Sequence, residues 1–428
     1  MYEELKGKKL LVIGSDEGTS NIVRTAKELG IYTIAVDGNK MSVKTPAKQM
    51  ADESWDIDYR ETEKIAELAV KEKVDGVFAG YSEFRVMAAC KISKLIGSPF
   101  YATEEQIELT WNKRKFKDLC KKSGVRVPQD YLLDPRGELD ENSDIHFPVI
   151  VKPVDYAGRN GITICSSKDQ LSEAIAFARS KSVTNSILVE EYIEGMEFAA
   201  LYTIVDGVIS FSSLKDKYIT NGSKSKSSLC ELSITPSAHL KRYLDTTHNS
   251  VKEFIRAAGI KNGVAQFQGI MTDDDFCIFE MGYRLPGGND YVYSEKCHNI
   301  NYMKMMICYS LTGSMGDDIS KDSPYYDRCF AQFLVYVHAG TVGSADFSRL
   351  NGVEGIGDLH IWAKPGRTFV EDGTTQQRAF TCKLMGRDIN EIKRLIKYVQ
   401  DNITIEDENS NNMMFKPFNT ERIRYEAD

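Results

Sequence analysis

The sequence lacks several features that would indicate particular classes of protein. Its nine cysteines include no C-x-x-C pair, so they indicate reduced thiols and neither a disulfide framework nor a zinc site. The formal net charge of −8 argues against a protein that binds nucleic acid, because contacts to a phosphate backbone require a basic face. No apolar run reaches the roughly 18 residues of a membrane-spanning helix, and the start has no apolar core of a signal peptide. We therefore expect a soluble, cytoplasmic protein without nucleic-acid or membrane partners.

Motifs of nucleophilic and metal-dependent hydrolysis are also missing. The six histidines form no H-x-x-x-H or similar cluster, and there is no G-x-S-x-G sequence. We interpret the histidines as structural or surface residues.

What is present is an alternation of apolar strands and helices in a chain of 428 residues, long enough for two or three domains. Apolar runs at 8–18, 32–37 and 73–80 alternate with helical segments, which predicts a parallel sheet with an open, doubly wound arrangement. Gly14 and Gly18, followed by Asp37, do not complete a G-x-G-x-x-G motif. They favour a Rossmann-like scaffold whose crevice serves another purpose, with an NAD-dependent oxidoreductase as an alternative.

Mixed elements follow from about residue 101. The segment 103–128 predicts two helices, the second stopped at Gly124. An Asp206–Gly207 turn predicts a hairpin over 197–219. The other expected elements are strands at 147–154, 161–167, 186–193, 263–271, 275–284 and 329–337, and helices at 168–180, 237–258 and 388–400.

Lys152 interrupts the apolar run FPVIVKPV at 147–154. A buried ammonium group needs a partner, so either Lys152 reaches solvent from an edge strand or it meets an anion. The segment 155–161, with Gly158 and Gly161, favours the anion, because the backbone N–H groups of a Gly-containing loop can surround phosphate oxygens.

Three segments in order resemble the ATP-grasp superfamily: NKRKFK (112–117), FPVIVKP (147–153) and LVEEYIEGMEF (188–198). The resemblance implies that Lys113 and Lys152 bind the phosphates of ATP beneath the loop that holds Gly158 and Gly161. It further implies that the adenine contacts are Glu190, Glu191, Tyr192 and Ile193, and that Glu197 binds the ribose.

A fourth segment, FEMGYRLPGG (279–288), is similar to the metal-binding strand of that family. The resemblance implies Glu280 and Gln268 as ligands of Mg²⁺, or alternatively Mn²⁺, and Arg284, together with Lys152, as catalytic residues. Two positions depart from the family pattern: Gln268 replaces an acid, and Gly282 replaces an asparagine.

The segment 368–399 resembles the C-terminal domain of glycinamide ribonucleotide synthetase and biotin carboxylase. The resemblance implies an α/β protein with an ATP-grasp fold: an N-terminal Rossmann-like (pre-ATP-grasp) domain at 1–105, an ATP-grasp domain at 106–318 and a small C-terminal α+β domain at 319–428. The lid subdomain would span about 118–190.

The implied activity is that of an ADP-forming ligase, which activates a carboxylate as an acylphosphate and couples it to an amine or thiol. The expected partners are ATP and these small molecules, with a homodimer as the expected assembly. Two alternatives are an ATP-binding regulator without turnover and a bicarbonate-using enzyme of the carbamoyl-phosphate or carboxylase type. The polar stretch 215–228 is either a solvated hairpin tip or a lid that uses Lys217, Tyr218, Lys224 or Lys226.

Overall fold

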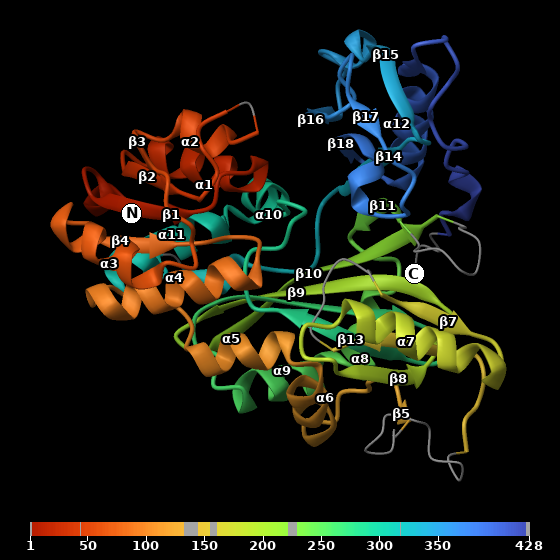
Figure 1. The fold of residues 1–428 in the computed structure, drawn as a ribbon, viewed down its shortest axis with the longest axis horizontal. Coiled ribbons are helices and arrows are strands. Elements are labelled where there is room, and N and C mark those ends of the chain that lie inside the picture. The colour runs from red at the N-terminus through yellow and green to blue at the C-terminus, as the bar shows by residue number, and fades with distance from the viewer. Residues whose placement is uncertain are drawn as a thin grey trace.

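The computed structural model describes residues 2–42, 44–131, 144–154, 161–220, 229–316 and 318–424. Figure 1 shows an N-terminal parallel sheet in red and orange, a small yellow sheet beside α7 (Leu171–Lys181), and a C-terminal part in blue. The long strands β9 (Met196–Val205) and β10 (Val208–Ile219) run between these parts. Gly158, which the sequence assigned to the site, and Lys224 and Lys226, which it considered for a lid, lie outside the described residues.

The N-terminal part is the predicted parallel sheet, in the strand order β3–β2–β1–β4. Leu10 to Ile13 of the inner strand β1 are at most 1% exposed, as expected for a parallel strand covered by helices. The elements are β1 (Lys9–Ile13), α1 (Glu17–Glu28), β2 (Tyr32–Val36), α2 (Pro46–Met50), β3 (Glu53–Trp55), α3 (Thr62–Lys71), β4 (Gly76–Phe78) and α4 (Glu83–Ile96).

Two helices follow, α5 (Glu104–Trp111) and α6 (Lys113–Lys122), as predicted. Asn112 separates them, and its side chain caps α6 by accepting a hydrogen bond from the backbone N–H of Lys115 at 3.2 Å. Gly124 lies just beyond α6 with a φ of +73°, the left-handed conformation that favours glycine. The cap therefore fixes Lys113 as the first residue of α6.

A small antiparallel sheet comes next, in the order β5–β8–β6–β7. Its strands are β5 (Asp130–Tyr131), β6 (Val149–Pro153), β7 (Thr163–Cys165) and β8 (Ile187–Glu191), and α7 packs on it around its own small core. Because β6 lies between β8 and β7, Lys152 is on an inner strand, and the edge-strand interpretation is wrong. Pro153 is the last residue of β6, where its missing N–H costs no ladder hydrogen bond.

The central sheet has eight strands in the order β13–β12–β9–β10–β11–β14–β18–β16. The predicted hairpin is present, and Asp206 and Gly207 at its turn have positive φ values of 49° and 82°. The sheet continues across residue 318, where we expected a domain boundary. Its other strands are β11 (Cys230–Thr235), β12 (Gly263–Met271), β13 (Phe276–Gly282), β14 (Cys329–Tyr336), β16 (Ile356–Ile361) and β18 (Arg378–Gly386).

Four helices cover this region: α8 (Leu240–Thr246), α9 (His248–Ala257), α10 (Tyr291–His298) and α11 (Tyr302–Thr312). The single helix predicted at 237–258 is wrong, because Thr247, with a φ of −119°, divides it into α8 and α9. Among the described helices, none combines the length and the apolar character needed to cross a membrane.

The C-terminal part packs the predicted amphipathic helix α12 (Ile389–Asp401) on β18 and β14, and it has its own core. A three-stranded sheet adds β15 (Gly340–Asp346), β17 (Thr368–Phe369) and β19 (Thr404–Asp407). Short 3-10 helices occur at Glu3–Leu5, Lys168–Gln170, Ile319–Lys321, Ser348–Leu350, Thr375–Gln377 and Thr420–Arg422.

Candidate active site

Lys152 has a buried acidic partner on the neighbouring strand. Its Nζ forms an ion pair with Oε2 of Glu190 on β8, and Nζ of Lys117 on α6 donates to Oε1 of the same carboxylate at 2.7 Å. Glu190 is 1% exposed. Burial by itself would raise the pKa of Glu190, but Lys152 and Lys117 outweigh it and lower the pKa. The buried lysine is thus matched by a charge inside the fold.

Lys113 lies beside the same end of β6. Its Nζ donates to the carbonyl of Val154, two residues beyond Lys152, at 2.8 Å. Lys117 follows Lys113 by four residues on α6, so both side chains are on the same face, and Nζ of Lys117 also bonds Asp130. The structure therefore brings both predicted phosphate-binding lysines to the end of β6.

Gly161 is the described glycine of the predicted phosphate loop. Its φ is +85°, and a Cβ there would lie 3.1 Å from Cγ of Pro153, so this position favours glycine on two grounds.

The segment predicted to contact adenine comprises the last two residues of β8 and the two residues after it, and its backbone is hydrogen-bonded within the small sheet. The N–H of Glu191 donates to the carbonyl of Gln129 at 2.9 Å, and the N–H of Tyr192 donates to the carbonyl of Pro148 at 3.3 Å. Ile193 is 8% exposed. The adenine contacts of Glu190, Glu191, Tyr192 and Ile193 stay predictions.

Four side chains form a connected polar row across one face of the central sheet. Nζ of Lys217 on β10 donates to Oε2 of Glu197 on β9 at 2.8 Å and to Oε1 of Gln268 on β12 at 3.2 Å. Nε2 of Gln268 then donates to Oε1 of Glu280 on β13 at 2.6 Å. Strand register explains the row, because Lys217 is opposite Glu197 and Gln268 is opposite Glu280. The predicted ribose ligand and both predicted metal ligands are thus brought together.

Arg284 lies where the central sheet meets the N-terminal part. Its Nε pairs with Oε1 of Glu83 at 2.6 Å, and its Nη1 donates to the carbonyl of Leu285 at 3.0 Å. Glu83 is in the first turn of α4. The guanidinium group is therefore held by an acid that the sequence did not identify.

The turn after Arg284 is held from three sides. Nζ of Lys215 on β10 pairs with Asp290, and Nζ of Lys383 on β18 donates to the carbonyl of Asn289 at 3.0 Å. The hydroxyl of Tyr81, from the N-terminal part, donates to Oδ1 of Asn289 at 2.9 Å. The three parts of the chain thus meet at this turn.

Two protein-family models match this chain, one over the residues of the polar row and one over the N-terminal part. Residues 145–288 match the model described as "ATP-grasp domain". The chain carries an ATP-grasp domain. The matched range includes Lys152, Glu197, Gln268 and Glu280. Residues 6–89 match the model described as "Biotin carboxylase, N-terminal domain".

Among curated relatives, the carbamoyl phosphate synthase large chain of Methanospirillum hungatei JF-1 is 24% identical over 305 residues. The alignment covers 65% of this chain and 28% of that protein. The chain thus spans little more than a quarter of that relative's length.

Solved structures share the fold over nearly the whole chain. A phosphoribosylglycinamide synthetase from Anaerococcus prevotii has a TM-score of 0.75 at 19% identity, covering 94% of this chain and 100% of that one. An L-amino acid ligase from Bacillus licheniformis has a TM-score of 0.79 at 17% identity, covering 94% and 99%. A biotin carboxylase domain dimer of the Hydrogenobacter thermophilus 2-oxoglutarate carboxylase, in complex with MgADP, ADP and bicarbonate, has a TM-score of 0.73 at 18% identity, covering 93% and 90%.

The ATP-grasp domain offers Mg²⁺ one carboxylate and one amide, on Glu280 and Gln268. Within the described ranges, no group of three or more His, Cys, Asp or Glu side chains is placed to hold a metal. Mg²⁺ in phosphate-binding sites commonly uses one or two protein carboxylates and takes its other oxygens from phosphates and water. Glu280 is exposed. The two residues therefore fit one ion shared with a nucleotide.

The crevice of the N-terminal sheet is filled by protein side chains. Nη1 of Arg85 pairs with Asp16, and its Nη2 lies 3.6 Å from Oδ2 of Asp37. A Cβ on Gly14, whose φ is +124°, would lie 2.7 Å from Nη1 of Arg85. The Arg85 guanidinium group thus lies against Gly14, paired with two carboxylates of the N-terminal part.

The structure adds contacts around the site that the sequence did not predict. Lys117 could have been found from its position one turn after Lys113, whereas Glu83, in the N-terminal part, carried no local signal, and Lys215 was distinguished only as part of the polar stretch 215–228. Lys217 and Tyr218 were considered for a lid, which is wrong, because both belong to β10 and Tyr218 is only 5% exposed.

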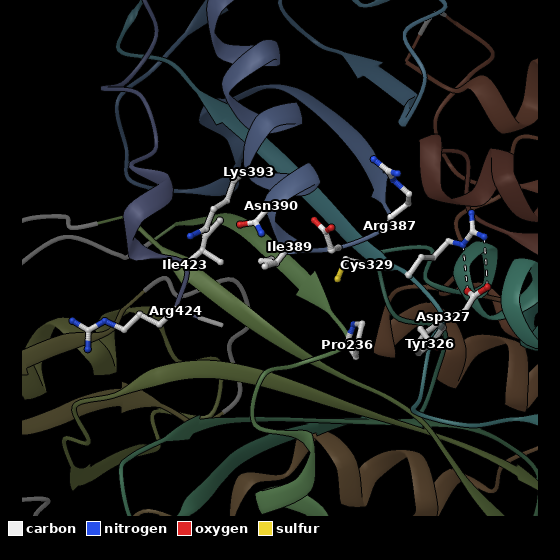
Figure 2. A pocket seen from close by; sticks show the side chains of 12 residues that line it. Pro236, Tyr326, Asp327, Cys329, Arg387, Ile389, Asn390, Lys393, Ile423 and Arg424 are labelled. Carbon is white, nitrogen blue, oxygen red and sulfur yellow. Dashed lines mark hydrogen bonds and ion pairs between the residues drawn. The ribbon is translucent and has the colours of Figure 1, made fainter. Parts of the chain in front are cut away.

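A separate hollow of about 750 Å³ lies in the C-terminal part (Figure 2). None of the predicted site residues lines it. Arg387 and Arg424 lie far apart across the hollow. Arg328 is paired with Asp327. The charged groups that line the hollow therefore do not converge on one point. Its lining consists of Pro236, Tyr326, Asp327, Arg328, Cys329, Arg387, Asp388, Ile389, Asn390, Lys393, Ile423 and Arg424.

Proposed function

We propose that this protein is an ATP-dependent ligase that activates a carboxylate as an acylphosphate, releases ADP and couples the acyl group to an amine or thiol. One observation carries the proposal: Lys113 and Lys152 lie at the same end of β6, and Lys152 shares the matched ATP-grasp range with the Gln268–Glu280 pair on the central sheet. The similarity to an L-amino acid ligase supports it, since amino acids contain both a carboxylate and an amine.

In the proposed complex, Lys113 and Lys152 bind the phosphates of ATP, under a loop that includes Gly158 and Gly161. Glu190, Glu191, Tyr192 and Ile193 line the adenine, and Glu197 accepts hydrogen bonds from the ribose hydroxyls. Phosphate oxygens would compete with Glu190 for the ammonium group of Lys152. Lys117 would then keep the Glu190 carboxylate paired.

The proposed reaction has two steps. A carboxylate oxygen attacks the γ-phosphorus, the bond to the bridging oxygen breaks, and ADP leaves. The amine or thiol then attacks the acyl carbon, inorganic phosphate leaves, and the nucleophile loses one proton. Catalysis here consists of positioning and charge stabilisation.

Gln268 and Glu280 would hold Mg²⁺ or Mn²⁺, which when bound neutralises charge on the phosphate oxygens. Arg284, held by Glu83 through Nε, would direct its remaining N–H groups toward the transferring phosphoryl group. Lys113 and Lys152, which lie at the same end of β6, would contact the α- and β-phosphates, and Lys152 would also reach the γ-phosphate.

A second candidate is a bicarbonate-using enzyme. The carbamoyl phosphate synthase large chain and the bicarbonate-bound biotin carboxylase domain favour it. The two candidates differ in one measurement, because ADP release would depend on bicarbonate alone in the second. A homodimer, the form of that biotin carboxylase domain, stays a prediction for this chain.

The test is to incubate the purified protein with Mg-ATP and pooled carboxylates and amines, with and without bicarbonate, and to record ADP, AMP, phosphate and product mass. We expect ADP and an amide or thioester product, with turnover abolished in Glu280→Gln while its melting temperature stays near that of the wild type. Release of AMP would contradict the acylphosphate route. Binding of ATP without any ADP release would favour the regulator alternative.

A further inference from the structure

We propose that Lys217 supplies, as a fixed ammonium group, the positive charge that a second divalent ion supplies in two-metal phosphoryl-transfer sites. The chain then binds its nucleotide with one divalent ion. This inference rests on the proposed function, since it concerns how the same site balances the charge of a triphosphate.

The ammonium group of Lys217 lies beside the predicted metal ligand Gln268. Nζ of Lys217 lies 3.2 Å from Oε1 of Gln268, the oxygen that would coordinate a metal, and 2.8 Å from Oε2 of Glu197. The Lys217 side chain is 16% exposed and that of Glu197 is 9% exposed. The ammonium group is therefore held at the metal-ligand row by two acceptors on neighbouring strands.

The two neighbours of the Gln268 amide fix its orientation. An ammonium group only donates and an ionised carboxylate only accepts, so Oε1 must face Lys217 and Nε2 must face Glu280. A glutamate at 268 could not donate to Glu280 and would place two carboxylates side by side. Glutamine therefore suits this position, because it accepts a hydrogen bond from the Lys217 ammonium group and adds no second carboxylate beside Glu280.

The polar row contains few carboxylates for binding metal ions. The row holds two of them, and Glu197 is paired with Lys217. Glu280 alone is left to offer a carboxylate to a metal in this row, with the Gln268 amide beside it. Two divalent ions bound 3.5–4 Å apart, roughly the usual spacing of two-metal sites, need more negative ligands than this.

Gly282 is a position where a substitution can add a metal ligand to the row. A Cβ at this position would lie 3.6 Å from Cζ of Arg284, an ordinary contact, and the residue has no positive φ. A Cβ is therefore accommodated here without a backbone clash. The triple variant Gln268→Glu, Gly282→Asn, Lys217→Met adds oxygen ligands and removes the ammonium group.

The experiment measures Mn²⁺ bound to the full chain with a non-hydrolysable ATP analogue, using electron paramagnetic resonance of free Mn²⁺ and equilibrium dialysis of the nucleotide. We expect one Mn²⁺ per bound nucleotide in the wild type and two in the triple variant. Lys217→Met alone should weaken binding of the Mn-nucleotide by about tenfold or more, and Lys217→Arg should recover most of the loss. Lys241→Met, which removes a lysine that is 76% exposed and paired with Asp245, is the matched control.

Two Mn²⁺ per nucleotide in the wild type would overturn the inference and leave the proposed function standing. So would a Lys217→Met protein that is folded by circular dichroism and binds the Mn-nucleotide as tightly as Lys241→Met. A wild-type protein that retains no nucleotide at all would instead refute the proposed function, and the inference with it.

Discussion

Glu190 and Lys152 show how much the role of a single residue depends on its partners. The sequence placed Lys152 in an apolar strand and predicted phosphate oxygens as its partner, whereas the structure shows an ion pair with Glu190 that the sequence did not predict. It also adds Lys117, which lies in the segment NKRKFK but was given no role there, because its partner lies 73 positions away in the chain. A buried ion pair of this kind is visible only once tertiary contacts are known.

Lys152→Met keeps the apolar stem of the side chain and removes its charge. Because Glu190 retains Lys117, we expect a loss of about 1–3 kcal/mol in the free energy of unfolding, less than for an unpaired buried charge. Nucleotide affinity should fall by at least about tenfold, since a charged contact to the phosphates is lost. Urea unfolding and calorimetric titration measure the two effects. Lys121→Met, on the exposed side of α6, serves as the control, and equal nucleotide affinity in both variants would refute the role of Lys152.

Glu190→Gln tests the buried cluster through its pH dependence. The pKa of Glu190 is lowered from the ordinary 4.5, so the ionised carboxylate stabilises the fold above that pH, and the stabilisation is lost as the pH falls through the lower native pKa. At neutral pH the variant should lose about 3–5 kcal/mol in the free energy of unfolding, because the neutral amide removes the negative charge that offsets two buried ammonium groups. Of these two groups, only Lys117 has a second carboxylate among the described residues, on Asp130. The difference from the wild type should shrink below pH 4.5 in chemical unfolding experiments. A difference that stays constant from neutral to acidic pH would contradict the assignment.

At the scale of elements, long apolar or strongly periodic segments were predicted well. The strand at 9–13 lies within its predicted range, and the β9–β10 hairpin and α12 match theirs to within one residue at each end. Short edge elements were not predicted, such as β17, which has two residues and pairs with β15 in a polar region. Such strands exist because a partner is present, so their own residues carry little signal.

Asn112→Ala tests the element that carries Lys113 and Lys117. The asparagine caps α6, so its loss should lower the free energy of unfolding by about 1 kcal/mol. Fraying of the first turn should also weaken nucleotide binding several-fold, since Lys113 is the first residue of the helix. Asn112→Asp keeps a capping oxygen and should retain both properties. If Ala and Asp variants bind nucleotide equally, the cap does not position Lys113.

At the scale of the whole molecule, the site depends on contacts that join the three parts. Arg284 pairs with Glu83, and the turn at Asn289 is held by Tyr81 and Lys383. Helix α11 also returns to pack on β4 of the N-terminal sheet. None of these contacts could be predicted from a single segment, because each joins residues that the topology alone brings together.

Gly76→Ala tests the packing of α11 on the N-terminal sheet. A Cβ at Gly76 would lie 2.0 Å from the backbone oxygen of Ser310, and backbone cannot move aside as a side chain can. We expect a loss of about 1–3 kcal/mol or more in the free energy of unfolding. Gly357→Ala, where no atom lies within 4 Å of the new Cβ, should change stability by less than about 0.5 kcal/mol. Equal stability of the two variants in urea unfolding would contradict this packing.

The most direct test of the proposed nucleotide site is a crystal structure of the full chain with Mg²⁺ and a non-hydrolysable ATP analogue. We expect the triphosphate in contact with Lys113 and Lys152, with Mg²⁺ joining the phosphates to Glu280 and Gln268. Phosphates bound away from these residues, or a metal held without Glu280, would contradict it.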